Sequence, residues 1–225
     1  MLAGKLPVTG LLTGMSFVLI LAFSIPPGIF TARHAGGRLD RAMTAVNQAL
    51  MAIPAFVTGI LLTYVFGLVL RWFVPGNYVS PGDNLGGSLW YFLFPAVSIA
   101  LPRVAMTVKM LRSSILSELQ KDYVRTSHSR GNSDRATLYR HVLRNAMGPV
   151  VSFLAMTVAD IVAGSVVIEQ VFSLPGLGRM LLTSIANRDY PVVQAVVVIV
   201  AFWVVLVNLL ADLINQRLDP RLRLT

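Results

Sequence analysis

Two ionisable residues, Arg103 and Asp160, interrupt long stretches of sequence that are otherwise apolar. A charge at mid-bilayer costs at least about 2.5 kcal/mol on insertion scales, and such residues usually pair with one another or line a substrate or ion path. Because the two stretches are consecutive, we predict that Arg103 and Asp160 lie close enough to form an intramembrane ion pair. A position facing a water-filled pathway is the alternative for Asp160.

Signatures of enzymes and metal sites are absent from the sequence. There is no phosphate-binding G-x-x-x-x-G-K-[ST] loop, no H-E-x-x-H pair and no G-x-S-x-G turn. The three histidines, His34, His128 and His141, lack metal-ligand spacing, and the chain has no cysteine. We therefore expect no catalytic residue, metal or cofactor, so any work must draw energy from a partner or a gradient.

Five long apolar stretches dominate the chain and must position the two charges. Charged residues make up 13% of the 225 residues, whereas a soluble domain carries about 25%. A membrane-spanning helix needs roughly 20 mostly apolar residues. We predict an all-α polytopic membrane protein, a single domain over 1–225, whose five spanning helices cover 6–30, 45–70, 90–111, 146–168 and 191–213.

The basic residues lie almost entirely between these stretches, which argues against a nucleic-acid partner despite a net charge of +9. Fourteen of them fall in regions that can share one side of a membrane, and four fall on the opposite side. The fourteen are Arg33, Arg38, Arg41, Lys109, Arg112, Lys121, Arg125, Arg130, Arg135, Arg140, Arg144, Arg217, Arg221 and Arg223; the four are Lys5, Arg71, Arg179 and Arg188. Since Lys and Arg accumulate in short cytoplasmic loops, the sequence predicts an outer amino terminus and a cytoplasmic carboxyl terminus.

The long charged segment 113–144 connects the third and fourth apolar stretches. Its apolar residues follow a roughly helical spacing as far as Val124, and the pattern breaks at Gly131-Asn132-Ser133-Asp134. This predicts two short helices on either side of a glycine turn, with a helix start after the turn. An ordinary solvated loop that joins two spans fits the periodicity equally well.

Residues 122–131, with 139–146 after them, resemble the cytoplasmic EAA-type loop of permease subunits of binding-protein-dependent ABC importers, most closely the dipeptide/oligopeptide/nickel branch. Gly131 falls where that motif has its glycine, and Leu143 follows twelve residues later. The resemblance implies that this loop receives movement from an ATPase, with Tyr123, Val124 and Arg125 exposed for docking into a groove of the partner. The matching loop residues are Tyr123, Val124, Arg125, Thr126, Ser127, Gly131, Arg140, His141, Leu143 and Asn145.

A second similarity covers residues 164–178, which resemble the outer loop of the same branch. The resemblance implies that this loop lies on the side of the external binding protein, and 188–191 and the terminal 218–221 also match. The residues that we assign to this outer side are Glu169, Phe172, Pro175, Gly176, Gly178, Arg188 and Asp189.

The resemblance implies a multi-pass protein of the bacterial cytoplasmic membrane that works with a second homologous permease, two ATP-binding subunits, an external solute-binding protein and membrane lipid. The solute would be a peptide or a related small molecule. The similarity begins at Lys5, which in the family follows a first spanning helix, so we expect that helix to be missing. Two alternatives remain: a secondary transporter that uses Asp160 as an ion or proton site, and a truncated, non-functional remnant.

Overall fold

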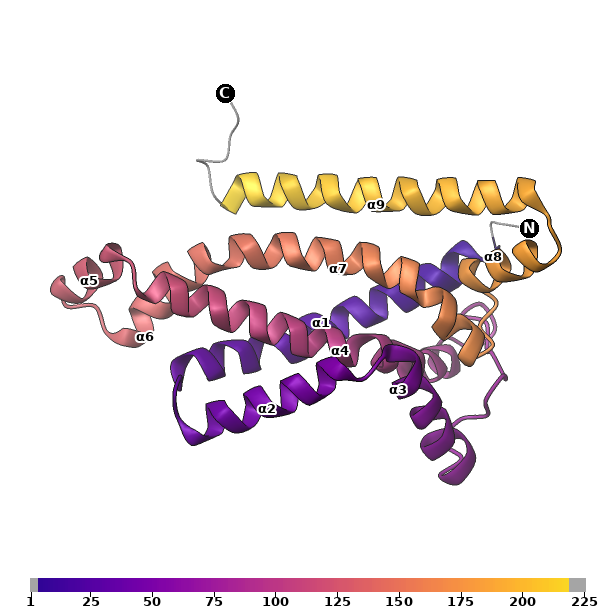
Figure 1. Cartoon of the computed structure of the whole chain (residues 1–225), viewed down its shortest axis with the longest axis horizontal. Helices are drawn as coiled ribbons and strands as arrows, with labels where there is room; N and C mark the ends of the chain where they lie inside the picture. Colours follow the sequence, from indigo (N-terminus) through magenta and orange to yellow (C-terminus); the bar gives the residue numbers. More distant parts are fainter. Residues whose placement is uncertain (1–3, 219–225) are drawn as a thin grey trace.

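The computed structural model describes residues 4–218, and within that range the chain forms helices joined by turns, with no strand. The longest helices are α1 (Leu6–Arg33), α4 (Leu85–Leu119), α7 (Leu143–Val171) and α9 (Tyr190–Leu218). They lie along a common long axis (Figure 1). The predicted all-α class is confirmed. The basic residues Arg221 and Arg223, and most of the terminal motif, lie outside the described residues.

Helix α4 is the centre of the bundle and packs against α1, α2, α3 and α7. It is also the most buried of the long apolar helices. Where α1 crosses it, a Cβ on Gly28 would lie only 2.8 Å from the Leu111 Cδ2 atom. Glycine at this position leaves room for the buried Leu111 side chain, so α1 packs closely against α4.

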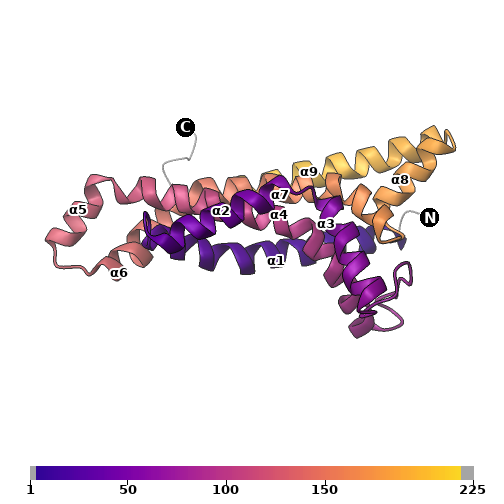
Figure 2. The ribbon, with the colours of Figure 1, turned by 60° about the horizontal axis from the view of Figure 1, so that its bottom comes forward.

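The predicted second span, 45–70, is wrong as a single continuous helix. The structure has α2 (Arg38–Ala52), then α3 (Ala55–Leu62) continued by η2 (Thr63–Val69), and the two parts are bent by 91°. Pro54 causes the break, because it lacks a backbone N–H and forces Ile53 into the extended region, with φ −89° and ψ 118°. Figure 2 shows α3 turning away from the axis that α2 follows.

Among residues 4–218, four helices are long and apolar enough to cross a bilayer, and the bent pair makes a fifth crossing if it counts as one span. The four long helices all extend beyond the ranges predicted for them: α1 ends at Arg33, α4 begins at Leu85 and ends at Leu119, α7 covers Leu143–Val171, and α9 covers Tyr190–Leu218. The extensions add polar and charged turns at the helix ends, which hydropathy does not detect.

Short helices occupy both ends of the bundle. At one end lie α5 (Asp122–Ser129), α6 (Asp134–Thr137) and η3 (Leu138–Val142), and we call this the α5 end. The predicted pair of short helices around Gly131 is present there, rather than an irregular loop. At the other end lies α8 (Leu177–Ala186), close to the start of α1, and we call this the α8 end.

Candidate functional site

The α5 helix ends in a tight hydrogen-bonded turn at Gly131. The Gly131 N–H donates to the His128 carbonyl at 2.9 Å, and the Asn132 N–H donates to the Ser127 carbonyl at 3.3 Å. These two bonds are the pattern of a Schellman motif, which needs a left-handed residue after the helix. Gly131 takes that conformation, with φ +82°. The predicted role of this glycine in a turn therefore has a geometric basis.

A buried polar contact fixes α5 against α6. The Ser127 and Thr137 hydroxyl oxygens lie 2.9 Å apart, and the Asn132 side-chain amide donates to Ser127 at 3.1 Å. Ser133 is the N-cap of α6, because its hydroxyl accepts from the Ala136 N–H at 3.3 Å. The polar residue Ser127 thus holds the two short helices together as one unit.

The expected exposure of Tyr123 and Val124 is wrong. Val124 is buried in the core and Tyr123 is half-buried, because this face of α5 packs against the rest of the loop and the bundle. Arg125 and Thr126 are exposed, and so are His128 and Ser129. A partner at this end would meet a polar face of α5 rather than an apolar one.

Tyr123 connects α5 to both long helices that flank the loop. Its hydroxyl donates to the Glu118 Oε2 atom of α4 at 2.8 Å and also makes a hydrogen bond with Asn145 of α7. Burial raises the pKa of the Tyr123 phenol above its ordinary value, so the hydroxyl keeps its proton near neutral pH. A cavity of about 260 Å³ lies beside it, lined by Tyr123, Thr126, Ser127, Arg130, Asn132 and His141.

Two further residues predicted for this loop, Arg140 and Leu143, differ in their exposure. Arg140 in η3 is exposed, whereas Leu143 at the start of α7 packs against the core. The loop residues are therefore divided between those that fix its shape and those that face outward.

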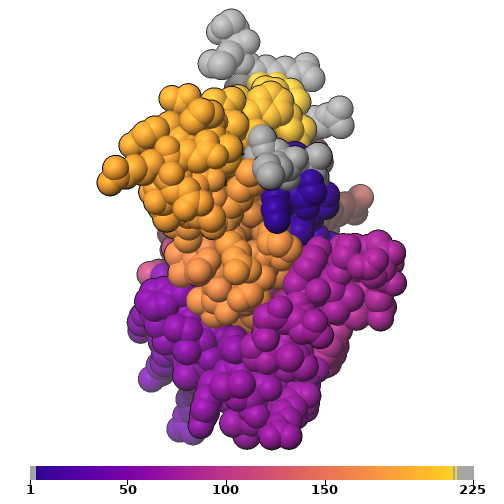
Figure 3. Space-filling model, turned by 90° about the vertical axis from the view of Figure 1, so that its right-hand side faces the viewer, coloured from indigo at the N-terminus to yellow at the C-terminus, as the bar shows by residue number. Residues whose placement is uncertain are grey.

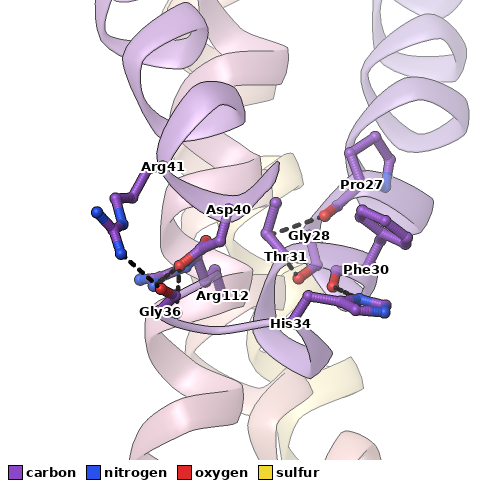
Figure 4. Close-up of polar contacts among 9 residues, drawn as sticks. All are labelled: Pro27, Gly28, Phe30, Thr31, His34, Gly36, Asp40, Arg41 and Arg112. Atoms are coloured by element: carbon purple, nitrogen blue, oxygen red, sulfur yellow. Dashed lines mark hydrogen bonds and ion pairs between the residues drawn. The ribbon is translucent and has the colours of Figure 1, made fainter. Parts of the chain in front are cut away.

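A two-pronged ion pair joins α2 to α4 not far from the α5 end (Figure 4). The Arg112 Nε and Nη2 atoms each donate to one oxygen of Asp40, both at 2.8 Å, and the Asp40 side chain is almost fully buried. Oδ2 also accepts from the N–H of Gly36, at 2.9 Å, in the turn that connects α1 to α2. Bidentate arginine–carboxylate pairs fix orientation as well as distance, so this contact ties the α1–α2 turn to α4.

A buried carboxylate organises the α8 end. Glu169 of α7 is fully buried and accepts from the Thr9 hydroxyl of α1 at 2.6 Å and from the Arg179 N–H at 2.9 Å. Thr9 in turn accepts from the Leu177 N–H at 2.9 Å. The carboxylate thus stands at the amino terminus of α8, where free N–H groups and the helix dipole stabilise a negative charge.

Two glycines make room for this carboxylate. A Cβ on Gly176 would collide with the Glu169 carboxyl group, and a Cβ on Gly178 would lie 2.5 Å from the Val166 Cα atom. The adjoining Phe172 is buried, and its carbonyl accepts from the Tyr91 hydroxyl at 2.6 Å. Figure 3 looks onto this end, where the segment after α7 lies against the start of α1 and the loop before α4.

The residues predicted for the outer loop therefore fall into two groups. Glu169, Phe172, Gly176 and Gly178 are buried and hold the end of the bundle together, so they shape the loop from within. Pro175 is half-buried. Arg188 and Asp189 are exposed; Arg188 ends α8 with φ 57°, and Asp189 starts α9 by accepting from the Val192 N–H at 3.3 Å.

Arg103 and Asp160 lie next to each other, but within residues 4–218 no ion pair joins them. The Arg103 Nη2 atom donates to the main-chain carbonyl of Asp160 at 3.2 Å, and Nη1 donates to the Ile99 carbonyl at 3.1 Å. The predicted ion pair is thus replaced by a side-chain-to-backbone contact between α4 and α7. The Asp160 carboxylate itself is exposed.

Comparison with known proteins identifies the kind of molecule that carries these features. Residues 24–224 match the family described as binding-protein-dependent transport system inner membrane component. The chain belongs to this family. It is 33% identical over 223 residues to a probable peptide ABC transporter permease protein, y4tP, of Sinorhizobium fredii, and 35% identical over 224 residues to the oligopeptide transport system permease protein AppB of Bacillus subtilis. Each alignment covers 99% of this chain and 71% of the relative.

Two solved permease chains share the fold of this family member. Both are described as inward-facing conformations of the MetNI methionine ABC transporter. One aligns with a TM-score of 0.72 at 18% identity, over 96% of this chain and 94% of the other. The second aligns with a TM-score of 0.76 at 16% identity, over 97% and 96% of the two chains. The family match and the two peptide permease relatives make this protein a multi-pass inner-membrane permease subunit of an ABC importer; it is not an enzyme, and separate subunits hydrolyse ATP.

Sequence reasoning missed three contributors to these contacts in the permease. Asp40 was not singled out, although it is the only acidic residue among the three arginines that flank the first turn. Thr9 and Ser165, whose hydroxyls point to Glu169, were also missed. Hydroxyl residues in apolar helices carry no local signal of their partners, because they often bond to the preceding turn of their own helix.

Proposed function

We propose that this permease forms half of the translocation pathway of an ATP-driven importer of peptides or related small solutes, together with a second homologous permease, two ATP-binding subunits and an external solute-binding protein. The peptide relatives of about one-third identity support the solute class. The observation that carries the proposal is the rigid α5–α6 unit, which is held between α4 and α7 at one end of the bundle.

The membrane orientation follows from where the basic residues lie. The ends of α1, α4 and α5 and the starts of α2 and α7 gather most of them toward the α5 end. Under the positive-inside rule this distribution supports an orientation with the α5 end in the cytoplasm and the α8 end outside. Cysteines at the exposed positions Asp83 and Ile185 should react with an impermeant thiol reagent in intact cells, and a cysteine at Arg135 should react only after permeabilisation. Labelling of the Arg135 position in intact cells would contradict this orientation.

The proposed mechanism transmits movement of the ATP-binding subunits through α5. The exposed polar face with Arg125 and Thr126 docks on those subunits, while Val124, Tyr123 and Ser127 tie the helix to α4, α7 and α6. Short helices shift as units between states. From α4, the Arg112–Asp40 pair passes the movement to α2 and so toward its break at Pro54.

Uptake by the reconstituted complex tests the proposal. The permease, its homologous partner and the ATP-binding subunits are placed in proteoliposomes with the binding protein, and uptake of a labelled short peptide is measured with ATP, with a non-hydrolysable analogue, and with a proton gradient alone. We expect uptake only with hydrolysable ATP. Uptake driven by the gradient alone would favour the secondary-transporter alternative.

Site-specific photocrosslinking tests the docking face. A crosslinker at Thr126 should capture an ATP-binding subunit, whereas one at the exposed Met156, far along α7 from the α5 end, should not. Equal capture from both positions, or none from Thr126, would contradict the role of α5.

A further inference from the structure

A cavity of about 370 Å³ opens beside the break between α2 and α3, where it faces the middle of α4 and α7. Its wall includes Pro54 and Ala55 at the break, Arg103 and Met106 on α4, and Met156 and Asp160 on α7. Pockets for small molecules occupy roughly 300–1,000 Å³, so the cavity is large enough for one compact solute. Its position matches the rule that irregular backbone within a membrane is tolerated where it lines a water-filled cavity.

Two opposite charges, Arg103 and Asp160, face this cavity, and within residues 4–218 they attract each other without forming an ion pair. The Arg103 guanidinium is held in place by two carbonyls, those of Ile99 and Asp160, and by the close approach of Gly164, where a Cβ would lie 3.3 Å from Nη2. These contacts leave the remaining guanidinium N–H groups available, because arginine has five donors. No hydrogen bond or ion pair engages the Asp160 carboxylate within the described part of the chain.

Such an arrangement is costly unless something binds to it. A charged side chain deep in a membrane protein pairs, or lines the path of an ion or a substrate. In transporters, helices broken near the middle of the membrane often form the substrate site. Here the break, a fixed cation and a free carboxylate share one cavity.

We propose that this cavity is a binding site for a small zwitterion, a solute that carries an ammonium group and a carboxylate, as free amino acids and short peptides do. Asp160 binds the ammonium group, and the free N–H groups of Arg103 bind the carboxylate. This inference rests on the proposed function for its place in a transport pathway, and it narrows the substrate class to solutes with both charged end groups.

The apolar part of the wall suits a variable side chain. Three methionines, Met51, Met106 and Met156, lie around the two charges. Methionine is flexible and polarizable and adapts to differently shaped apolar groups. The charged residues would therefore select the end groups of the solute, while the methionines would accept different side chains.

Binding of dialanine to the purified permease pair tests the inference without transport. Saturation-transfer NMR is recorded with dialanine, with N-acetyl-dialanine, which lacks the ammonium, and with dialanine amide, which lacks the carboxylate. We expect a signal with dialanine, and a loss of affinity of at least about 10-fold for either modified form, the factor expected when a charged hydrogen bond is removed. Equal binding of all three, or no binding of dialanine, would overturn the proposal.

Substitutions at Asp160 and Arg103 then test which end group of the solute each residue binds. Asp160→Asn should lose about 10-fold in affinity for dialanine yet bind N-acetyl-dialanine as the wild type does, whereas Asp160→Glu should keep most of the affinity. Arg103→Gln should likewise lose about 10-fold in affinity for dialanine yet bind dialanine amide as the wild type does. Asp212→Asn, on the exposed face of α9, serves as the matched control and should bind like the wild type. If a variant does not assemble, the three ligands on the wild-type protein still decide the question.

Dialanine uptake by the reconstituted complex separates this inference from the proposed function. Binding without ATP-dependent uptake would contradict the proposed function and leave the site intact. ATP-dependent uptake with no effect of either end group on binding would support the function and refute the site.

Discussion

Each end of the bundle contains a turn that ends a helix with the same hydrogen-bond pattern, but the residue in the left-handed conformation differs between the two turns. At the α8 end the turn after α7 has the hydrogen-bond pattern of a Schellman motif, Ser173 N–H to the Gln170 carbonyl and Leu174 N–H to the Glu169 carbonyl, with Ser173 at φ 53°. At the α5 end the same pattern uses Gly131. The turn at the α8 end therefore places a residue with a Cβ in the left-handed conformation, which favours glycine. The turn at the α5 end has glycine itself at this position.

The surroundings of the two turns account for the difference. Buried contacts between residues far apart in the sequence hold the turn after α7: the Thr9 hydroxyl donates to the Glu169 carboxylate, and the Tyr91 hydroxyl donates to the Phe172 carbonyl. The turn at Gly131 is exposed, and the contacts that shape it are local. The α8 end is therefore locked by tertiary contacts, whereas the α5–α6 unit is rigid internally and attached mainly through α4 and α7. This is the arrangement expected of an element that moves as a body.

Removal of the Glu169 carboxylate should have the largest effect on the stability of the α8 end. Glu169→Ala leaves the Thr9 hydroxyl and the Arg179 N–H without their buried acceptor, and each buried unsatisfied donor costs about 1–3 kcal/mol. We expect the melting temperature of the purified permease to fall by roughly 5–10 °C. Glu169→Gln, which keeps one acceptor oxygen, should lose less, and Asp83→Ala, at an exposed position of the same end, should lose little. Equal melting temperatures for all variants would show that the end is not locked by this group.

Added volume at the glycines beside Glu169 should have the next largest effect. Gly178→Ala places a methyl group 2.5 Å from the Val166 Cα atom, a main-chain atom that cannot move aside easily. Overpacking of this kind costs about 1–3 kcal/mol, so thermal stability should drop. Gly14→Ala is the control, because no atom lies within 4 Å of the added group. A drop for both variants would point to a general intolerance of α-helical substitutions instead of a local clash.

The Asp40–Arg112 pair should affect coupling more than stability. Arg112→Lys keeps the charge but cannot make the two parallel hydrogen bonds to Asp40, so the α1–α2 turn should no longer follow α4 faithfully. We expect transport per ATP hydrolysed to fall several-fold, while the amount of assembled complex changes little. Lys109→Arg, one helical turn earlier on α4, is the conservative control. If Arg112→Lys transports normally, the link between α2 and α4 does not carry the movement.

The sequence predicts the parts of this permease that depend on local chemistry. The glycine turn at residue 131, the start of α6 at Ser133 and the apolar helices all follow from residues within one or two turns of each other. The contacts that fix the bundle cannot be predicted from neighbouring residues, because Asp40 and Arg112 are 72 positions apart in the sequence, and Thr9 and Glu169 are 160 positions apart. Pro54 was visible, but proline in a membrane helix gives either a mild kink or a full break, and only the packing of α3 against α4 decides for the 91° bend.

The turn after α5 can be tested by replacing the residue at position 131, which holds the left-handed conformation. Gly131→Val should destabilise the turn by about 1–2 kcal/mol, the cost of a left-handed backbone for a residue with a Cβ. No atom lies within 4 Å of the added Cβ, so the cost comes from the backbone alone. Gly131→Asn is therefore the matched control, because asparagine adds a side chain but tolerates this conformation.

Since the turn lies far from the locked end, the melting temperature of the permease should change little in either variant. The ATP hydrolysis that the binding protein stimulates in the full complex should fall about 3-fold to 10-fold for Gly131→Val, because a misdirected α5 docks poorly, and should stay near the wild-type rate for Gly131→Asn. Equal losses in the two variants would mean that the side chain, and not the backbone, disturbs docking. An unchanged rate in both would mean that this turn does not aim the helix, and the contrast between the two ends would then concern folding rather than transmission.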